Sequence, residues 1–221
     1  MYYKALVATT LPEHSSKMPL RASRTTSEAP VSLHARALEN VAFVRGVMER
    51  TSHFTAVPGW GGVAMGATAI GASVLASTQR APRLWFGVWA AEAALSVIIG
   101  VVAIVIKARR HSVPLGVGPA RRFALCMLPA LVAGAALTAA CAGAEAWTLM
   151  PVVWLLLYGV GVCAAGAVSS PPVVSLLGLA LVAGGTAAAF SPAAWGNWYL
   201  AALFGVGHIV AGIVIIRHHG G

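Results

Sequence analysis

The sequence predicts an all-α polytopic membrane protein with about six transmembrane helices and a juxtamembrane amphipathic helix in front of them. Of its 221 residues, 58% are hydrophobic and only 10% are charged, whereas soluble globular domains carry about 25% charged residues. The apolar residues gather into six runs near the ~20 residues that a helix needs to cross a bilayer. These runs are continuous and do not alternate as the strands of a membrane barrel do, so they are predicted to be helices.

Residues 1–31 are polar, contain three prolines and show no apolar periodicity. We therefore expect a disordered cytoplasmic tail in this region. The apolar run from Ala5 to Leu11 is short for a signal-peptide core, and no small-residue cleavage site follows it. Met18 is an alternative start, and the sequence leaves the choice between Met1 and Met18 open.

A helix with one apolar stripe is predicted for residues 32–53, in a juxtamembrane segment that extends to residue 56. Ser32 is placed to cap the N-terminus of this helix. A basic amphipathic helix at this position either lies in the membrane interface or docks on a protein partner or a second copy of the chain. The stripe recurs at spacings of three and four and consists of Leu33, Ala37, Val41, Val44 and Met48.

The segment from Phe54 to Gly62 joins this helix to the first transmembrane span. Pro58 and Gly59 are predicted to interrupt the helix at the membrane surface, and Trp60 is placed for the aromatic belt of the interface. Two interpretations follow. The segment is either a simple elbow between two helices or a hinge, formed by these three residues, that carries signals between them.

A six-helix transmembrane domain is predicted for residues 57–217. Continuous apolar runs of this length favour helices because a helix satisfies its own backbone hydrogen bonds in lipid. Very few residues separate the third span from the fourth, which predicts a tight hairpin. The six spans are expected at about residues 59–77, 84–106, 123–143, 147–168, 173–190 and 198–216.

The basic residues predict the orientation of the spans. Seven of the 15 Lys and Arg residues precede the first span, five lie between the second and third, and one follows the sixth. With six spans, these regions share one side of the membrane, and only Arg80 and Arg83 lie on the other. The positive-inside rule then predicts a multi-pass protein of the plasma (inner) membrane with both termini in the cytoplasm.

The last four spans look like a duplicated hairpin, with one copy over residues 122–168 and the other over residues 171–217. Small apolar alphabets produce short matches by chance, but the shared order of these matches favours duplication. Parallel repeats of this kind occur in some transporters and also in scaffolds. The matched elements are Ala-Leu-Val-Ala-Gly at 130–134 and 180–184, Leu-Tyr-Gly-Val-Gly at 157–161 with Leu-Phe-Gly-Val-Gly at 203–207, Thr138 with Thr186, and Trp147 with Trp195.

Glycines punctuate the spans at helical spacings. Gly62 and Gly66 form a GxxxG pair, and Gly205 and Gly212 are seven residues apart on one face of the sixth span. Small residues let helix backbones approach closely in a bilayer. We therefore interpret these glycines as packing positions.

Glu92 and His208 are the two ionisable residues well inside predicted spans. At a rise of ~1.5 Å per residue they lie about 12 Å and 15 Å from the outer ends of their helices. Tyr158 reaches a similar depth, and Thr138 and Thr186 reach the outer half from the other direction, which suggests one polar layer in the outer half. Such a layer either binds a proton, a cation or a small ligand, or acts as a structural clamp between helices.

No motif for catalysis, nucleotide binding or a cofactor is visible. The three cysteines have no CxxC or Cys/His spacing, no HExxH, GxSxG or P-loop occurs, and aspartate is absent. Haem b would call for a further deep ligand, whereas His208 is the only histidine at depth. We expect no enzyme, metal or cofactor, and we attribute the net charge of +9 to cytoplasmic loops rather than to nucleic-acid binding.

The stretch from Leu38 to Gly66, centred on Phe-Thr-Ala-Val-Pro-Gly-Trp-Gly-Gly at residues 54–62, is similar to uncharacterised small multi-pass membrane proteins of bacteria. This resemblance covers the first span and the helix before it. It implies a bacterial inner-membrane setting, and no activity is attached to that group.

Two classes of function rank above the others. The first is a non-enzymatic membrane component that regulates or joins a complex, which the juxtamembrane helix and the lack of catalytic motifs favour. The alternative is a small transporter or channel that uses the polar layer around Glu92 and His208. A membrane enzyme ranks third, because no catalytic constellation is visible.

Overall fold

The computed structural model describes residues 36, 38–43, 58–110, 119–169 and 171–219. The chain divides into two units, of which the first ends at Arg45 and the second contains all six spans. Within the first unit, residues 36 and 38–43 are helical, and they fall inside the range predicted for the amphipathic helix. The expected tail over residues 1–31, the rest of the 32–53 helix and residues 54–57 lie outside the described residues.

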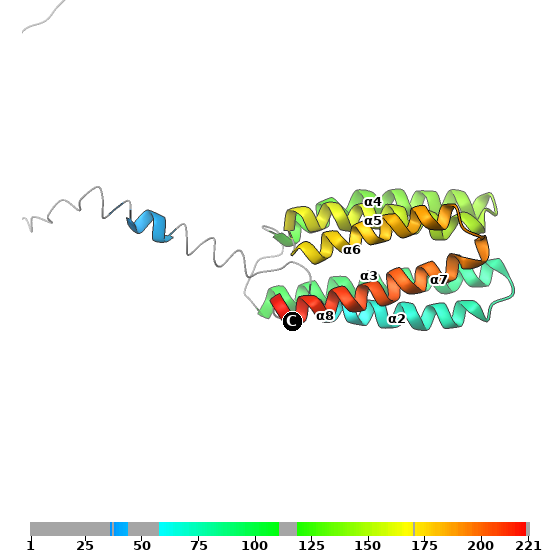
Figure 1. Ribbon diagram of the computed structural model, residues 1–221, viewed down its shortest axis with the longest axis horizontal. Helices are drawn as coiled ribbons and strands as arrows, with labels where there is room; N and C mark the ends of the chain where they lie inside the picture. Colours follow the sequence, from blue (N-terminus) through cyan, green and yellow to red (C-terminus); the bar gives the residue numbers. More distant parts are fainter. Residues whose placement is uncertain (1–35, 37, 44–57, 111–118, 170, 220–221) are drawn as a thin grey trace, which may run out of the picture. The chain divides into compact units, whose positions relative to one another are not determined.

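The described residues of the second unit form helices joined by short turns and contain no strand, which confirms the predicted all-α class. Six helical segments are long and apolar enough to cross a bilayer, so the fold is that of a multi-pass membrane protein (Figure 1). The first five are α2 (Gly59–Ser77), α3 (Pro82–Arg110), α4 (Pro119–Gly143), α5 (Met150–Ser169) and α6 (Pro172–Ala189).

The sixth segment is a composite of two α-helices and a π-helix between them. It consists of α7 (Gly196–Leu200), the π-helix η3 (Ala201–Gly207) and α8 (His208–His219). Short 3-10 turns, η1 (Trp147–Leu149) and η2 (Ala193–Trp195), lead into α5 and α7. The predicted spans agree with these helices to within a few residues, although α3 is 29 residues long and so extends beyond the expected 84–106.

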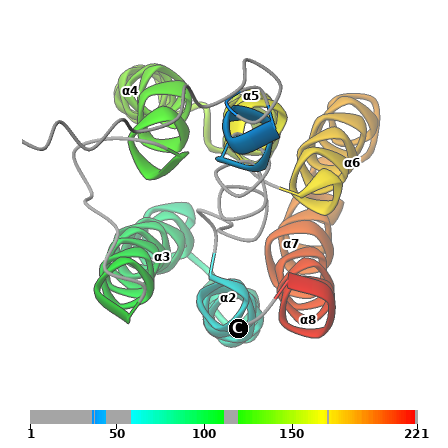
Figure 2. The same ribbon diagram turned by 90° about the vertical axis from the view of Figure 1, so that its left-hand side faces the viewer.

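The six segments pack as two rows of three (Figure 2). In one row α5 lies between α4 and α6, and in the other α2 lies between α3 and α8. The rows meet where α6 contacts the sixth segment. Because six segments cross in alternation, the start of α2 and the end of α8 lie at the same end of the bundle (Figure 1).

Glycines allow the backbones of α2 and the sixth segment to touch. A Cβ atom on Gly66 would lie 2.5 Å from the carbonyl oxygen of Gly205, and one on Gly59 would lie 2.6 Å from that of Gly212. Only glycine fits such an approach without moving backbone. The packing role predicted for Gly66, Gly205 and Gly212 is therefore confirmed by their contacts.

The α5–α6 seam uses the same device. A Cβ on Gly159 would lie 3.0 Å from the carbonyl oxygen of Gly178, and a Cβ on Gly178 would run into the backbone of Cys163. Gly159 belongs to the Leu-Tyr-Gly-Val-Gly element, and Gly205 occupies the same place in the Leu-Phe-Gly-Val-Gly element. Each element therefore places a glycine at a close helix–helix contact. The two hairpins pack differently, because α4 packs along α5, whereas the sixth segment packs mainly on α2 rather than on α6.

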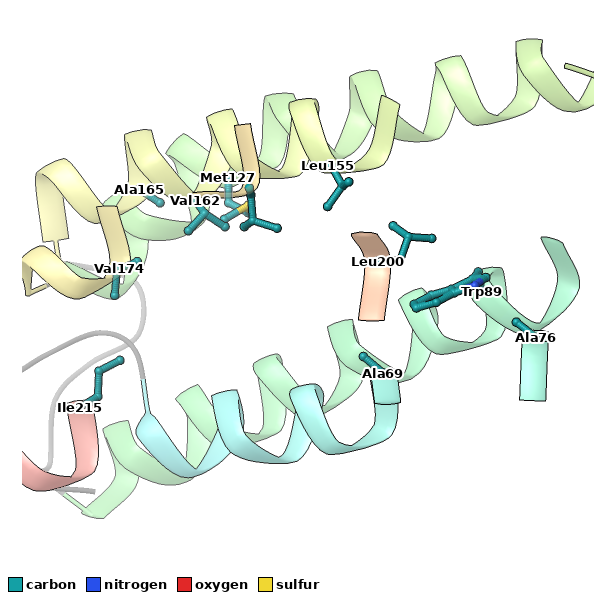
Figure 3. Close-up of a cluster of buried hydrophobic side chains, with 11 residues drawn as sticks. Ala69, Ala76, Trp89, Met127, Leu155, Val162, Ala165, Val174, Leu200 and Ile215 are labelled. Atoms are coloured by element: carbon teal, nitrogen blue, oxygen red, sulfur yellow. The ribbon is translucent and has the colours of Figure 1, made fainter. Parts of the chain in front are cut away.

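Buried apolar side chains of both rows form one cluster, and several of them point toward the space between the rows (Figure 3). Leu155 and Leu181 are fully buried on α5 and α6, and Leu200 and Ile215 are buried on the sixth segment. Lipid tails are as apolar as leucine, so this core contributes close van der Waals packing rather than transfer from water.

Candidate functional site

Glu92 on α3 is buried against α2 and is only 7% exposed. Its Oε1 atom accepts hydrogen bonds from the hydroxyl groups of Thr68 on α2 and Ser96 on α3, both at 2.8 Å. Ser96 lies one turn after Glu92, so both face α2 together. Among the described residues, no hydrogen bond reaches the second carboxylate oxygen, Oε2.

His208 at the start of α8 is 6% exposed and contacts Tyr158 on α5. Its Nδ1 atom lies 3.3 Å from the carbonyl oxygen of Leu203. A carbonyl only accepts, so Nδ1 carries the proton and Nε2 accepts from the Tyr158 hydroxyl at 3.0 Å. Phe204 packs against both rings, with centroids 5.1 Å from Tyr158 and 5.9 Å from His208.

The histidine follows directly on the seven-residue π-helix η3. π-Helical turns are rare and occur frequently at functional sites. Here the carbonyl that meets the imidazole belongs to the residue five positions earlier, which matches the wider spacing of this helix type. The π-helix therefore helps to set both the orientation and the tautomer of His208.

Asn197 on α7 forms a third polar cluster, which the sequence reasoning missed. Its Oδ1 atom accepts from the indole groups of Trp85 and Trp89 on α3, at 3.2 and 3.0 Å. Its Nδ2 atom donates to the carbonyl and hydroxyl oxygens of Ser73 on α2, at 3.2 and 3.0 Å. The amide thus uses its full hydrogen-bonding capacity and ties three helices together.

A signal for this cluster was present in the sequence. Trp85 and Trp89 are four residues apart, so they share one face of a helix, and a buried indole N–H calls for an acceptor. Asn197 was passed over because it precedes the span predicted from residue 198, whereas the helical segment begins earlier.

The two threonines of the expected layer have separate surroundings. Thr138 donates to the carbonyl oxygen of Gly134 at 2.7 Å and accepts from the indole of Trp154 at 2.8 Å, so it joins α4 to α5. Thr186 donates to the carbonyl oxygen of Val182 on its own helix and is exposed.

Of the five residues expected to form one layer, the structure joins only Tyr158 and His208 by a hydrogen bond. Glu92 bonds to α2, and α2 lies between its helix and α8 (Figure 2). The expected single layer is therefore divided into separate clusters. Sequence position gives the depth of a side chain along the helix axis, but it does not give the direction in which that side chain points across the bundle.

The predicted hinge residues lie at the first turn of α2. Pro58 is the extended N-cap residue of this helix, with φ −77° and ψ 124°, and its carbonyl oxygen accepts from the N–H of Gly62 at 3.3 Å. Gly59 is locked in the seam against Gly212, whereas Trp60 is exposed. Any bending at Gly59 would have to open that seam, and residues 51–57 lie outside the described part of the chain.

Two further features lie at the end of the bundle where α2 ends and α3 begins. An open groove is lined by Trp195, Trp198, Tyr199 and Ala202. Arg83 and Glu145 form an exposed ion pair at 2.6 Å. Neither feature brings together a nucleophile and a base, which nucleophilic catalysis requires.

No group of three or more His, Cys, Asp or Glu side chains converges on a metal-sized site within the described residues. Cys126, Cys141 and Cys163 are free thiols. Comparison of the chain with protein-family models, with curated proteins and with solved structures gave no match. The candidate functional site is therefore defined by its own chemistry: the Glu92 cluster and the Tyr158–His208 pair.

Proposed function

We propose that this chain is a non-enzymatic, multi-pass component of the bacterial plasma (inner) membrane that regulates a membrane complex or forms part of one. The observation that carries the proposal is the closed hydrogen bonding of its polar side chains. Asn197, His208 and Thr138 each form at least one hydrogen bond to a neighbouring helix, and the remaining polar atoms of His208 and Thr138 bond to the backbone of their own segments. Bonds of this kind contribute about 0.6 kcal/mol each in a bilayer and act as clamps.

This arrangement favours a scaffold over a channel. A transporter uses a central polar site that opens to each side of the membrane in turn. In this bundle, the buried apolar residues Leu155, Leu200 and Ala69 lie in the core between the rows. Polar groups that are already paired have little capacity left for a passing solute.

Both termini are proposed to lie in the cytoplasm. Arg109 and Arg110 end α3, Arg121 and Arg122 begin α4, and Arg217 lies near the end of α8, all at one end of the bundle. At the opposite end, Arg83 is already paired with Glu145. A basic end facing the cytoplasm agrees with the positive-inside rule.

The lipid bilayer is the first partner, and the 32–53 helix is the proposed contact for a protein partner or a second copy. Val41 belongs to its predicted apolar stripe, whereas Glu39 lies off that stripe. In a background with the native cysteines replaced, Val41→Cys should form an oxidative crosslink in membranes and Glu39→Cys should not. Equal crosslinking of the two variants would argue against a specific contact.

Orientation can be measured separately by labelling single cysteines with a membrane-impermeant maleimide. A cysteine at Gln79 should react in intact cells, and one at His218 should react only after the membrane is opened. The reverse pattern would overturn the proposed topology while leaving the crosslinking test intact.

A small transporter or channel is the second candidate, and one observation favours it. Glu92 is an ionisable group at depth, with one oxygen that receives no hydrogen bond from the described residues. Proteoliposomes test the two candidates directly. A scaffold should not dissipate a pH or sodium gradient, whereas flux that is lost in Glu92→Gln would establish the transporter instead.

A further inference from the structure

We propose that Glu92, Thr68 and Ser96 form a proton-binding site whose protonated and ionised states share one arrangement of heavy atoms. The site lies between α2 and α3, about 15 Å along α3 from its first residue, Pro82, at ~1.5 Å per residue. The proposal stands independently of whether the chain is a scaffold or a transporter.

The hydroxyl group of Thr68 has more acceptors than it has hydrogens. Its Oγ1 atom lies 2.8 Å from Glu92 Oε1, 2.9 Å from the carbonyl oxygen of Met65 and 3.2 Å from that of Ala64. A threonine hydroxyl carries one hydrogen and can accept through its lone pairs. It therefore donates either to the carboxylate or to its own helix.

In the ionised state, Thr68 and Ser96 both donate to Oε1 of Glu92. The negative charge then receives two charge-assisted hydrogen bonds, which are the stronger kind. The Met65 carbonyl oxygen still accepts the backbone hydrogen bond of the helix. It no longer accepts from the Thr68 hydroxyl, which donates to Glu92 instead.

In the protonated state, Glu92 takes one proton from water and becomes a neutral acid. Its Oε1–H group donates to Thr68 Oγ1, the Thr68 hydroxyl turns to the carbonyl oxygen of Met65, and Ser96 still donates to Oε1. The result is a directed chain from Ser96 through Glu92 and Thr68 to Met65, and such chains strengthen their members. The change of charge requires the rotation of one hydroxyl group and no movement of a helix.

The contacts favour a proton over a metal cation. The distances of 2.8 Å from Glu92 Oε1 to the Thr68 and Ser96 hydroxyl oxygens are ordinary O–H···O hydrogen-bond distances. Carboxylate and hydroxyl oxygens from three residues also fall short of the six or more oxygens that a larger cation takes.

Within the described part of the chain, the hydrogen-bond partners of the Glu92 carboxylate are the uncharged hydroxyl groups of Thr68 and Ser96. α2 contains no ionisable residue, and η1, which also contacts α3, contains none. On α3 the nearest ionisable residues are Arg83 and Lys107, nine and fifteen positions away, or about 13 Å and 22 Å along the axis. Tyr158 and His208, on α5 and α8, hydrogen-bond to each other.

The test uses the full-length chain in nanodiscs, labelled with ¹³C-glutamate and followed by infrared difference spectroscopy as the pH is changed. The other five glutamates lie outside the spans. We expect one carboxylic-acid C=O band from a non-aqueous environment that appears and disappears with pH. Glu92→Gln should remove this band, and Glu145→Gln, a matched change at the exposed turn, should retain it.

Variants of Thr68 supply a second arm of the test. They retain Glu92, so the site can still be tested if the Glu92→Gln protein fails to fold. Thr68→Val removes a bond that is stronger to the ionised acid than to the neutral acid, so the site should hold its proton about tenfold more tightly. Thr68→Ser keeps the hydroxyl and should titrate as the unmodified protein does. Thr186→Val, on a threonine bonded only to its own helix, should have no effect.

Three results would overturn the proposal. The first is a Glu92 band that keeps one protonation state over the whole pH range in which the bundle stays folded. The second is a folded Thr68→Val protein that titrates as the unmodified protein does. The third is a tenfold change in the proton affinity of Glu92 when sodium is added at constant ionic strength, which would assign the site to a metal cation.

Discussion

Replacing Gly66 by alanine tests the seam between α2 and the sixth segment, where the two backbones lie in close contact. An added Cβ would lie 2.5 Å from the carbonyl oxygen of Gly205, 2.7 Å from Cγ1 of Ile209 and 2.9 Å from the Ile209 nitrogen. Two of these atoms belong to backbone, so a side-chain rotation cannot relieve the overlap. The helices must separate, and the neighbouring contacts of the seam are loosened with them.

The expected cost follows from two opposing effects. Overpacking a close-packed site costs about 1–3 kcal/mol, and contact with backbone places Gly66 at the upper end of this range. Alanine is the better helix former by about 1 kcal/mol, which offsets part of the cost. The net loss is about 2 kcal/mol, or roughly a thirtyfold change in the folding equilibrium constant.

Gly71 provides a matched control in the same helix, because a Cβ there would meet no atom within 4 Å. Gly71→Ala should therefore leave stability unchanged or raise it by up to about 1 kcal/mol. Both variants can be compared by SDS unfolding in bicelles, followed by the fluorescence of the seven tryptophans. A Gly66→Ala protein as stable as the Gly71→Ala protein would refute the close seam.

Three further substitutions test the polar contacts. Asn197→Ala removes four hydrogen bonds and should lower the free energy of unfolding by about 2.4 kcal/mol at ~0.6 kcal/mol per bond. Thr186→Val is its control. An equal loss of stability in the two variants would contradict the hydrogen bonds by which Asn197 joins three helices. Tyr158→Phe keeps the ring and should cost about 0.6–1 kcal/mol, with ¹⁵N-histidine NMR reporting the lost bond at Nε2; an unchanged spectrum would dismiss that bond. The Arg83–Glu145 pair, with side chains 76% and 64% exposed, should show a coupling of less than about 1 kcal/mol in a double-mutant cycle, and a larger coupling would indicate a shielded site.

The candidate site could be predicted in part. Glu92 and His208 were found because ionisable residues inside apolar spans are rare and costly, and Tyr158 was found because it lies at a matching depth. Thr68 and Ser96 were missed, since hydroxyl residues are common in spans and bond readily to their own helix. Their importance depends on which way α2 and α3 turn toward each other, and no residue spacing within one helix contains that information.

The same contrast between what the sequence determines and what the packing of the helices determines holds for the whole molecule. The length and continuity of the apolar runs are enough to determine six helices, because a chain in lipid must satisfy its backbone hydrogen bonds internally. Glycine spacing indicates that close contacts exist, but the structure decides that Gly66 meets Gly205 and that Gly159 meets Gly178. Helix neighbours and rotations are set by packing between segments distant in the chain. Only the assembled bundle therefore places Glu92 against Thr68 and His208 against Tyr158, because local sequence records depth along a helix and not direction across the membrane.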